Sequence, residues 1–215
     1  MKNFLLSTAL VLSAFAAHAQ KGSLYIGGQA GFNSTTTTAD NGSISTTTSK
    51  LNNWSFSPEV GTFLTNQVQL GVGFTFSGSR QETPGINSIN AITNRYGGTV
   101  YGRYFFGEGN FRPFVAVNAS VLPGNSRTEN NGIVNSTTRY STLDLGANLN
   151  AGFGYGLNKR LTVIGSFGTF GFQRSTSKQD NTNYKTTTTN FGLNANTLGN
   201  LFTVGVYYTF KQAGE

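Results

Sequence analysis

Few side chains in this sequence could take part in covalent or acid–base chemistry. The chain has no cysteine, and His18 is its one histidine. Disulfides, thiol catalysis and cysteine-based metal sites are therefore excluded, and a Ser-His-Asp arrangement would depend on His18 alone. Charged residues make up only 11% of the sequence, against roughly a quarter of a typical soluble domain. Any catalysis would have to come from a small number of carboxylates.

Four charged residues take equivalent positions in segments where apolar and polar residues alternate. Glu59, Arg103, Arg112 and Asp144 each stand at a polar position, and we interpret them as a charge cluster on an enclosed face. An enclosed charge needs a partner. Glu59 and Arg103 lie at similar depths relative to short turns, so we expect them to pair. The pair could select ions at a constriction or act as a structural plug, and the plug is the preferred interpretation.

The remaining acids do not suggest an active site. Asp40, Glu82, Glu129 and Asp180 fall one in each of four long polar segments. Two of them could converge as a general acid and base, but no spacing in the sequence favours such a pair. We therefore predict that the chain is not an enzyme, binds no cofactor and holds no metal.

The first residues have the features of an export signal. Lys2 precedes an apolar run over residues 4–16, and Ala17-His18-Ala19 forms a small-x-small cleavage site. This pattern is typical of a secretory signal peptide. We predict a signal peptide over residues 1–19 and one domain over residues 20–215, which would then contain no histidine.

Eight segments with the period-2 alternation of β-strands must position the charges. They cover residues 23–33, 54–65, 68–77, 96–106, 111–122, 142–155, 161–173 and, within 191–210, residues 200–210. Alternation is cleanest in residues 68–77. In residues 161–173 it is interrupted, because Ile164 and Phe170 take the opposite parity from Val163 and Phe167.

Short and long connections alternate between these strands. Residues 34–53, 78–95, 123–141 and 174–190 are rich in Thr, Ser and Asn, and we predict mobile loops there. A tilted strand needs roughly 9–11 residues to cross a bilayer. Short turns alternating with long loops are typical of transmembrane barrels, whose short turns face the periplasm. Both chain ends would then lie in the periplasm.

The composition of the two strand faces indicates which one points outward. One face carries large apolar side chains, whereas the other carries small polar ones. A face exposed to solvent would instead carry many charges. Eight strands enclose an interior just wide enough for side chains to fill. We therefore predict an all-β fold, a closed eight-stranded antiparallel transmembrane β-barrel with its apolar face toward lipid and aromatic girdles at the interfaces. The small lining includes Gly27, Gly31, Gly61, Gly71, Gly73, Gly146, Gly152 and Gly154.

The last strand has a distinctive ending. Thr203, Gly205, Tyr208 and Phe210 give a polar residue, a glycine two positions later, and aromatic residues at the fifth and seventh positions after it. This pattern resembles the C-terminal assembly signal read by the outer-membrane barrel assembly machinery, with residues 211–215 following it here. Together with its strands, the chain from about residue 21 to residue 210 resembles the small OmpA/OmpX-type, porin-like outer-membrane β-barrel proteins.

This resemblance implies a location more than an activity. It implies the outer membrane of a Gram-negative bacterium, a blocked lumen, and partnership with outer-membrane lipid, lipopolysaccharide and the barrel assembly machinery. We expect a monomer that binds no nucleic acid. The bases of the long polar segments could contact lipopolysaccharide head groups or serve only solubility. They are Lys50, Arg80, Arg95, Arg127, Arg139, Arg174, Lys178 and Lys185.

Three functions stay open at this point. The preferred one is a structural or cell-surface interaction role without catalysis. The second is a narrow passive channel for small solutes, and the third is a soluble secreted β-barrel that binds an apolar ligand.

Overall fold

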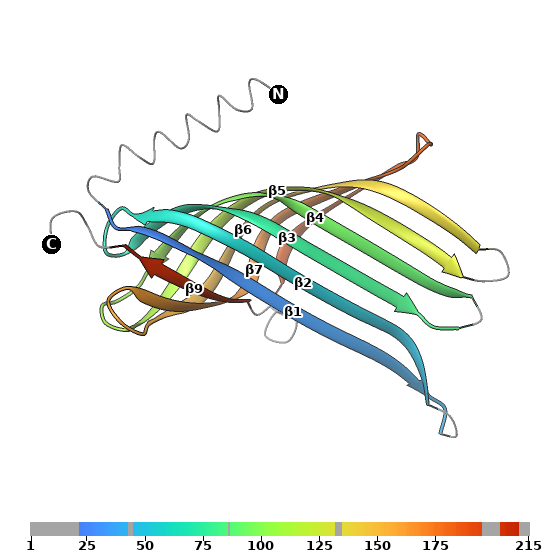
Figure 1. Ribbon diagram of the computed structural model, residues 1–215, viewed down its shortest axis with the longest axis horizontal. Coiled ribbons are helices and arrows are strands. Elements are labelled where there is room, and N and C mark those ends of the chain that lie inside the picture. Colours follow the sequence, from blue (N-terminus) through green and yellow to red (C-terminus); the bar gives the residue numbers. More distant parts are fainter. Residues whose placement is uncertain (1–21, 43–44, 86, 132–134, 195–202, 211–215) are drawn as a thin grey trace.

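A computed structural model describes residues 22–42, 45–85, 87–131, 135–194 and 203–210 (Figure 1). The signal peptide predicted over residues 1–19 lies outside the described residues, as do Phe202 and residues 211–215. Among the described residues, no helix is long and apolar enough to cross a membrane.

The described chain is a single antiparallel sheet of nine strands. Its order is β6-β5-β4-β3-β2-β1-β9-β7-β8, and an additional β6–β7 pairing joins the sheet into a barrel. The strands are β1 (Leu24–Asp40), β2 (Ser45–Phe63), β3 (Val68–Thr83), β4 (Ser88–Phe105), β5 (Phe111–Asn131), β6 (Asn135–Gly156), β7 (Leu161–Gln179), β8 (Lys185–Asn194) and β9 (Thr203–Thr209).

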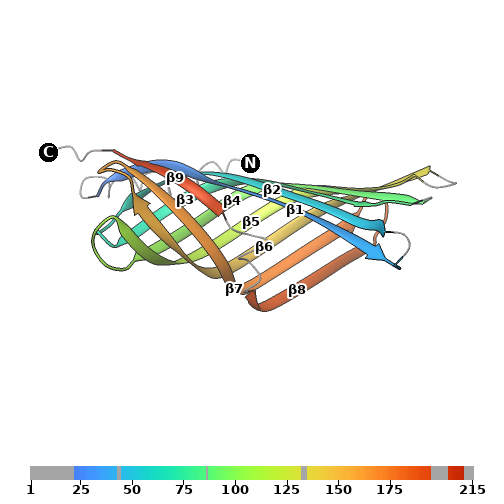
Figure 2. The same ribbon diagram turned by 90° about the horizontal axis from the view of Figure 1, so that it is seen from below.

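Two strands share the eighth position of the barrel. β8 pairs with Thr169–Lys178 of β7, and β9 pairs with Leu161–Ser166 of the same strand. β9 also pairs with Tyr25–Ala30 of β1, so the result is the closed eight-stranded antiparallel barrel that the sequence predicts. Figure 2 shows β8 and β9 at different heights beside β7. The predicted last strand, residues 200–210, contains β9, whereas β8 was not predicted and begins at Lys185, inside a predicted loop. Residues 195–202 lie outside the described residues.

The four long polar segments are mostly paired strand, so the prediction of long loops there was wrong. β5 and β6, for example, stay in register from Phe111↔Tyr155 to Asn131↔Asn135. Thr is a good strand former, because its branched Cβ suits a pleated surface. The Thr runs were read as loop from their polarity, whereas the structure pairs them across hairpins at the end of the barrel opposite the start of β1 and the end of β9 (Figure 1).

A bulge in β7 explains its interrupted alternation. The β6–β7 register shifts between Leu149↔Phe170 and Ala151↔Phe167, and Gly168 there has φ +68°. One extra residue in a strand reverses the facing of every side chain beyond it. Val163 and Phe167 before the bulge and Phe170 after it therefore all face outward.

The outer surface of the barrel is apolar over the height of a membrane. On β6 the outward side chains from Leu143 to Tyr155 are apolar, which covers roughly 40 Å along the strand and, at a tilt of about 40°, roughly 30 Å of height. That matches the hydrocarbon core of a bilayer. We call this outward zone the apolar belt. Its exposed members include Ile26, Phe56, Phe74, Val100, Val117, Leu149, Phe170 and Val206.

The two ends of the barrel differ. Phe210 N donates to Leu24 O at 2.8 Å, so both ends of the barrel domain meet where the short turns lie. We call this the short-turn end, and the opposite end, formed by the projecting strand pairs, the hairpin end.

Candidate functional site

Arg103 is the centre of a buried polar cluster inside the barrel. Its Nη2 donates to Glu59 Oε2 at 2.8 Å and to the Tyr207 hydroxyl at 3.1 Å, while its Nη1 donates to Gln69 Oε1 at 3.0 Å. The Tyr207 hydroxyl in turn donates to Glu59 Oε2, and Gln29 Nε2 donates to Glu59 Oε1 at 2.7 Å. The Arg103 and Glu59 side chains are only 3% and 6% exposed, so these bonds replace the lost hydration of both charges.

Tyrosine rings pack around the guanidinium. The Arg103 Cζ lies 4.0 Å from the centroid of the Tyr101 ring, a distance at which a cation is attracted to the ring face. The Tyr101 and Tyr25 hydroxyls are hydrogen-bonded at 2.7 Å. Gly61 and Gly71 make room for these hydroxyls, because a Cβ at either position would collide with them.

The cluster continues into an apolar seal toward the short-turn end. Phe105, Phe114 and Ile164 are each 2% exposed, and the Phe105 and Phe114 rings pack with centroids 5.3 Å apart. These side chains come from β4, β5 and β7. We call the whole group the lumen plug: Tyr25, Glu59, Tyr101, Arg103, Phe105, Phe114, Ile164 and Tyr207.

A polar chamber lies beside the plug on the side of the hairpin end. A cavity of about 310 Å³ is lined there by amides and hydroxyls from most of the strands. Asn118 Nδ2 donates to Asn150 Oδ1 at 3.1 Å, and Ser166 Oγ and Thr203 Oγ1 lie 2.6 Å apart. Apart from Glu59 the lining side chains are uncharged, so the chamber offers weak, neutral hydrogen-bonding partners.

The four charges predicted as one cluster do not form one. Glu59 and Arg103 pair in the plug, but Asp144 forms an ion pair with Arg95, 2.5 Å from its Nε. Arg112 Nη1 donates to the backbone oxygen of Asn66 at 2.8 Å at the short-turn end. Arg95 had been assigned to a loop, and its position on β4 places it in the lumen instead. The separation follows from height, because the charges share a face but not a level.

The four residues of the predicted assembly signal divide between the two faces of β9. Thr203 bonds to Gln29 Oε1 at 3.0 Å in the lumen, and Gly205 is buried on the same face. Tyr208 and Phe210 are on the outer face, 38% and 43% exposed, with their rings in edge contact at 5.2 Å.

Sequence reasoning missed the tyrosines of the plug. Tyr25, Tyr101 and Tyr207 were placed on the small polar face without being singled out. A signal was present, since a large aromatic residue on a face otherwise lined with glycine must fill the space those glycines leave. Gln29 and Gln69 were also missed, because they were treated as ordinary polar residues of that face.

Among the described residues, no group of three or more His, Cys, Asp or Glu side chains could hold a metal ion. The cluster contains one carboxylate and one guanidinium, bound to each other, so its chemistry is that of a neutralised pair.

Comparison with known proteins gives a consistent picture. The family model described as "Outer membrane protein beta-barrel domain" matches residues 4–196. Among solved structures, the chain is similar to Neisserial surface protein A (13% identity, TM-score 0.40, covering 87% of this chain and 97% of that one). It is also similar to Ail of Yersinia pestis (16% identity, TM-score 0.40, 88% and 97% covered). A third is the N-terminal barrel of OprF of Pseudomonas aeruginosa (14% identity, TM-score 0.31, 88% and 99% covered). A search of curated proteins gives no significant match.

Proposed function

Because this chain belongs to the outer membrane protein beta-barrel domain family, we propose that it is an integral outer-membrane protein with a structural or cell-surface interaction role. In this proposal it neither conducts solutes nor catalyses a reaction. Both termini face the periplasm, and the hairpin end faces the outside of the cell.

The lumen plug is the observation that supports this role. It fills the barrel with three tyrosines, two phenylalanines and a neutralised ion pair, and Tyr25, Phe105 and Ile164 rank as its largest fully buried side chains. Moving Arg103 or Glu59 would break several buried hydrogen bonds at once, each costly to leave unpaired. A channel would need a path through this level.

Planar-bilayer recording tests the closed lumen. The purified full-length protein is inserted into a bilayer, with flotation of proteoliposomes as proof of insertion, and the expected result is no steady conductance. Steady single-channel openings that change with Glu59→Gln or Arg103→Gln would instead establish the narrow passive channel.

Cell fractionation tests the membrane location against the soluble alternative. The exposed apolar belt favours lipid, because a soluble barrel that binds an apolar ligand would turn such residues inward. We expect the protein in the outer membrane, extractable only with detergent and running as a heat-modifiable band on a gel. Recovery from the periplasm without detergent would contradict the proposal.

A further inference from the structure

The bases of the strand extensions point outward rather than into the lumen. Strand parity places seven bases on the outer face: Lys50, Arg80, Arg127, Arg139, Arg174, Lys178 and Lys185. Arg174 lies opposite Leu145 of the apolar belt, and the other six lie beyond the belt toward the hairpin end. Arg95, the remaining base of these segments, faces inward and is neutralised by Asp144. The outer surface next to the belt is therefore basic.

On β2 and β3 the two bases share one acid. Lys50 lies directly opposite Glu82 in the register, and Arg80 Nη2 is 2.7 Å from Glu82 Oε1. Opposite charges facing each other across strands stabilise a sheet, and the register places no two bases opposite each other on this part of the surface.

On β5 to β8 the opposite arrangement occurs. Arg127 lies directly opposite Arg139, and Lys178 lies directly opposite Lys185. Like charges placed directly opposite each other destabilise a strand pair. These four consecutive strands contain two such pairs, and a counter-charge would relieve the repulsion within them.

The acids nearby pair with one of these four cations, Arg127. Glu129 Oε1 lies 3.1 Å from Arg127 Nε, and Asp180 Oδ1 accepts a hydrogen bond from Ser141 Oγ at 3.2 Å. Among the described residues, Arg139, Lys178 and Lys185 have no acid within ion-pair distance. The four cations and two carboxylates leave a net charge of +2.

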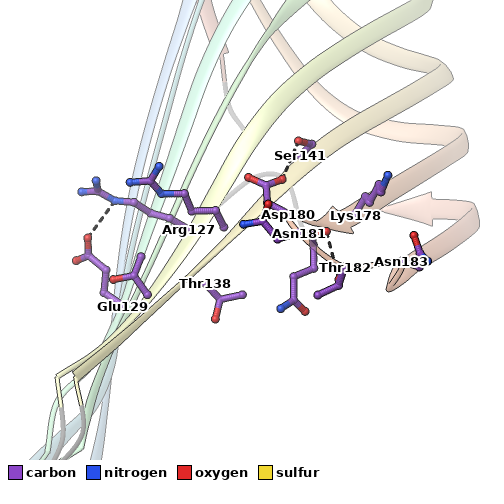
Figure 3. Close-up of a pocket in the computed structure, with 12 residues that line it drawn as sticks. Arg127, Glu129, Thr138, Ser141, Lys178, Asp180, Asn181, Thr182 and Asn183 are labelled. Carbon is purple, nitrogen blue, oxygen red and sulfur yellow. Dashed lines mark hydrogen bonds and ion pairs between the residues drawn. The ribbon is translucent and has the colours of Figure 1, made fainter.

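Except for Lys185, which lies opposite Lys178 on β8, these side chains line one groove on the outer surface. The groove has a volume of about 1100 Å³ and is bounded by β5, β6, the upper part of β7 and the β7–β8 turn. Figure 3 shows Arg127 on one side of it and Lys178 on the other, with Ser141 and Asp180 between them. The turn adds the side chains of Asn181, Thr182 and Asn183 as hydrogen-bonding groups.

The height of the groove indicates what occupies it. Arg139 is four residues beyond Leu143, the last apolar outward residue of β6, which is roughly 13 Å along the strand. This is the level of lipid head groups and the sugars attached to them. We infer that the groove binds the phosphorylated saccharide head group of an outer-leaflet lipopolysaccharide, with Arg127, Arg139 and Lys178 contacting its phosphates and Lys185, opposite Lys178, adding to the positive charge beside them. The inference rests on the proposed membrane location and orientation.

Lipid binding to two matched variants tests the inference. The site variant is Arg139→Gln with Lys178→Gln, and the control is Lys50→Gln with Arg80→Gln, which removes the same charge from the surface of β2 and β3, where no two bases stand opposite each other. The full-length protein is placed in phosphatidylcholine nanodiscs and titrated with purified lipopolysaccharide. We expect the site variant to bind roughly tenfold more weakly than the unmodified protein and the control to change little. Equal losses in both variants would overturn the inference, because binding would then follow total charge.

Two further probes identify the ligand chemistry. Enzymatically dephosphorylated lipopolysaccharide should lose most of the difference between the variants, and inorganic phosphate alone should not compete at comparable concentration. Undiminished binding of the dephosphorylated lipid, or full competition by free phosphate, would overturn the assignment to a phosphorylated lipid head group.

Thermal stability gives a readout that separates folding from binding. Without lipopolysaccharide, the site variant should lose its folded gel band at a higher temperature than the unmodified protein, since like-charge repulsion is relieved. With lipopolysaccharide, the order should reverse. A site variant that is less stable in both conditions would contradict the inference, whereas outer-membrane fractionation of all variants reports separately on the proposed function.

Discussion

The Glu59–Arg103 pair shows how burial turns two charges into a structural element. The guanidinium has an acid, an amide, a hydroxyl and an aromatic face as partners. Strand parity and comparable distances from the turns were enough to predict that the two charges meet. The tyrosines around them could not be predicted as partners, because parity gives the face of a residue but not which strand's side chain reaches across to it.

Removing one member of this pair should be costly. Arg103→Met leaves the Glu59 carboxylate buried without its counter-ion, and we expect a loss of about 3–5 kcal/mol in the free energy of unfolding. Urea unfolding followed by the heat-modifiable gel band measures the loss. The double variant Glu59→Leu/Arg103→Met should cost less than the sum of the single variants, because the two sites are coupled. Additive costs would contradict a direct pairing.

Glycines of the barrel wall differ in what they make room for. Gly71→Val should reduce stability by about 1–3 kcal/mol or prevent folding, since the added atoms meet the hydroxyls of Tyr101 and Tyr25. Gly98→Val on the neighbouring strand is the matched control, because no atom lies within 4 Å of a Cβ there. The folded fraction after refolding into detergent compares them, and equal tolerance of both would refute the role assigned to Gly71.

At the scale of elements, the bulge in β7 keeps the strand amphipathic. Sequence alternation alone could not place the bulge. Until the pairing with β6 is known, one inserted residue cannot be distinguished from a segment that simply lacks alternation. The strand extensions were misjudged for a related reason. Thr-rich segments are polar enough for a loop and branched enough for a strand, and the cross-strand partner decides between the two.

Deleting Gly168 should invert the upper half of β7. Phe170 and Phe172 would then point into the lumen and Gln173 toward lipid, so we expect little folded barrel by the heat-modifiable gel band. Deletion of Gly42, an exposed glycine in the β1–β2 connection with φ +85°, is the control and should be tolerated. Normal folding after the Gly168 deletion would show that the bulge is not required for the facing of these side chains.

At the scale of the whole molecule, the overall architecture of the barrel could be predicted from the sequence. Even strand count, alternation and small lining were sufficient to predict closure and the lipid-facing surface. The division of the eighth position into β8 and β9 could not be predicted. Residues 191–210 contain two stretches that alternate, and either stretch alone could have formed the eighth strand.

The orientation of the barrel can be measured with single cysteines, since the chain has none of its own. Thr36→Cys in a strand extension should react with a membrane-impermeant maleimide on intact cells. Lys159→Cys in the β6–β7 turn should react only after the outer membrane is permeabilised. The reverse pattern would place the hairpin end in the periplasm and remove the basis for lipid head-group binding.

The lumen plug also bears on how many copies of such a protein a cell can carry. An outer membrane is a permeability barrier, and every open pore in it admits toxic solutes along with nutrients. Under the proposal of a closed lumen, a barrel filled by Arg103, Glu59 and the surrounding tyrosines adds surface to the cell without adding leak. Its abundance can then be set by what its exterior does, independently of the cost of a hole.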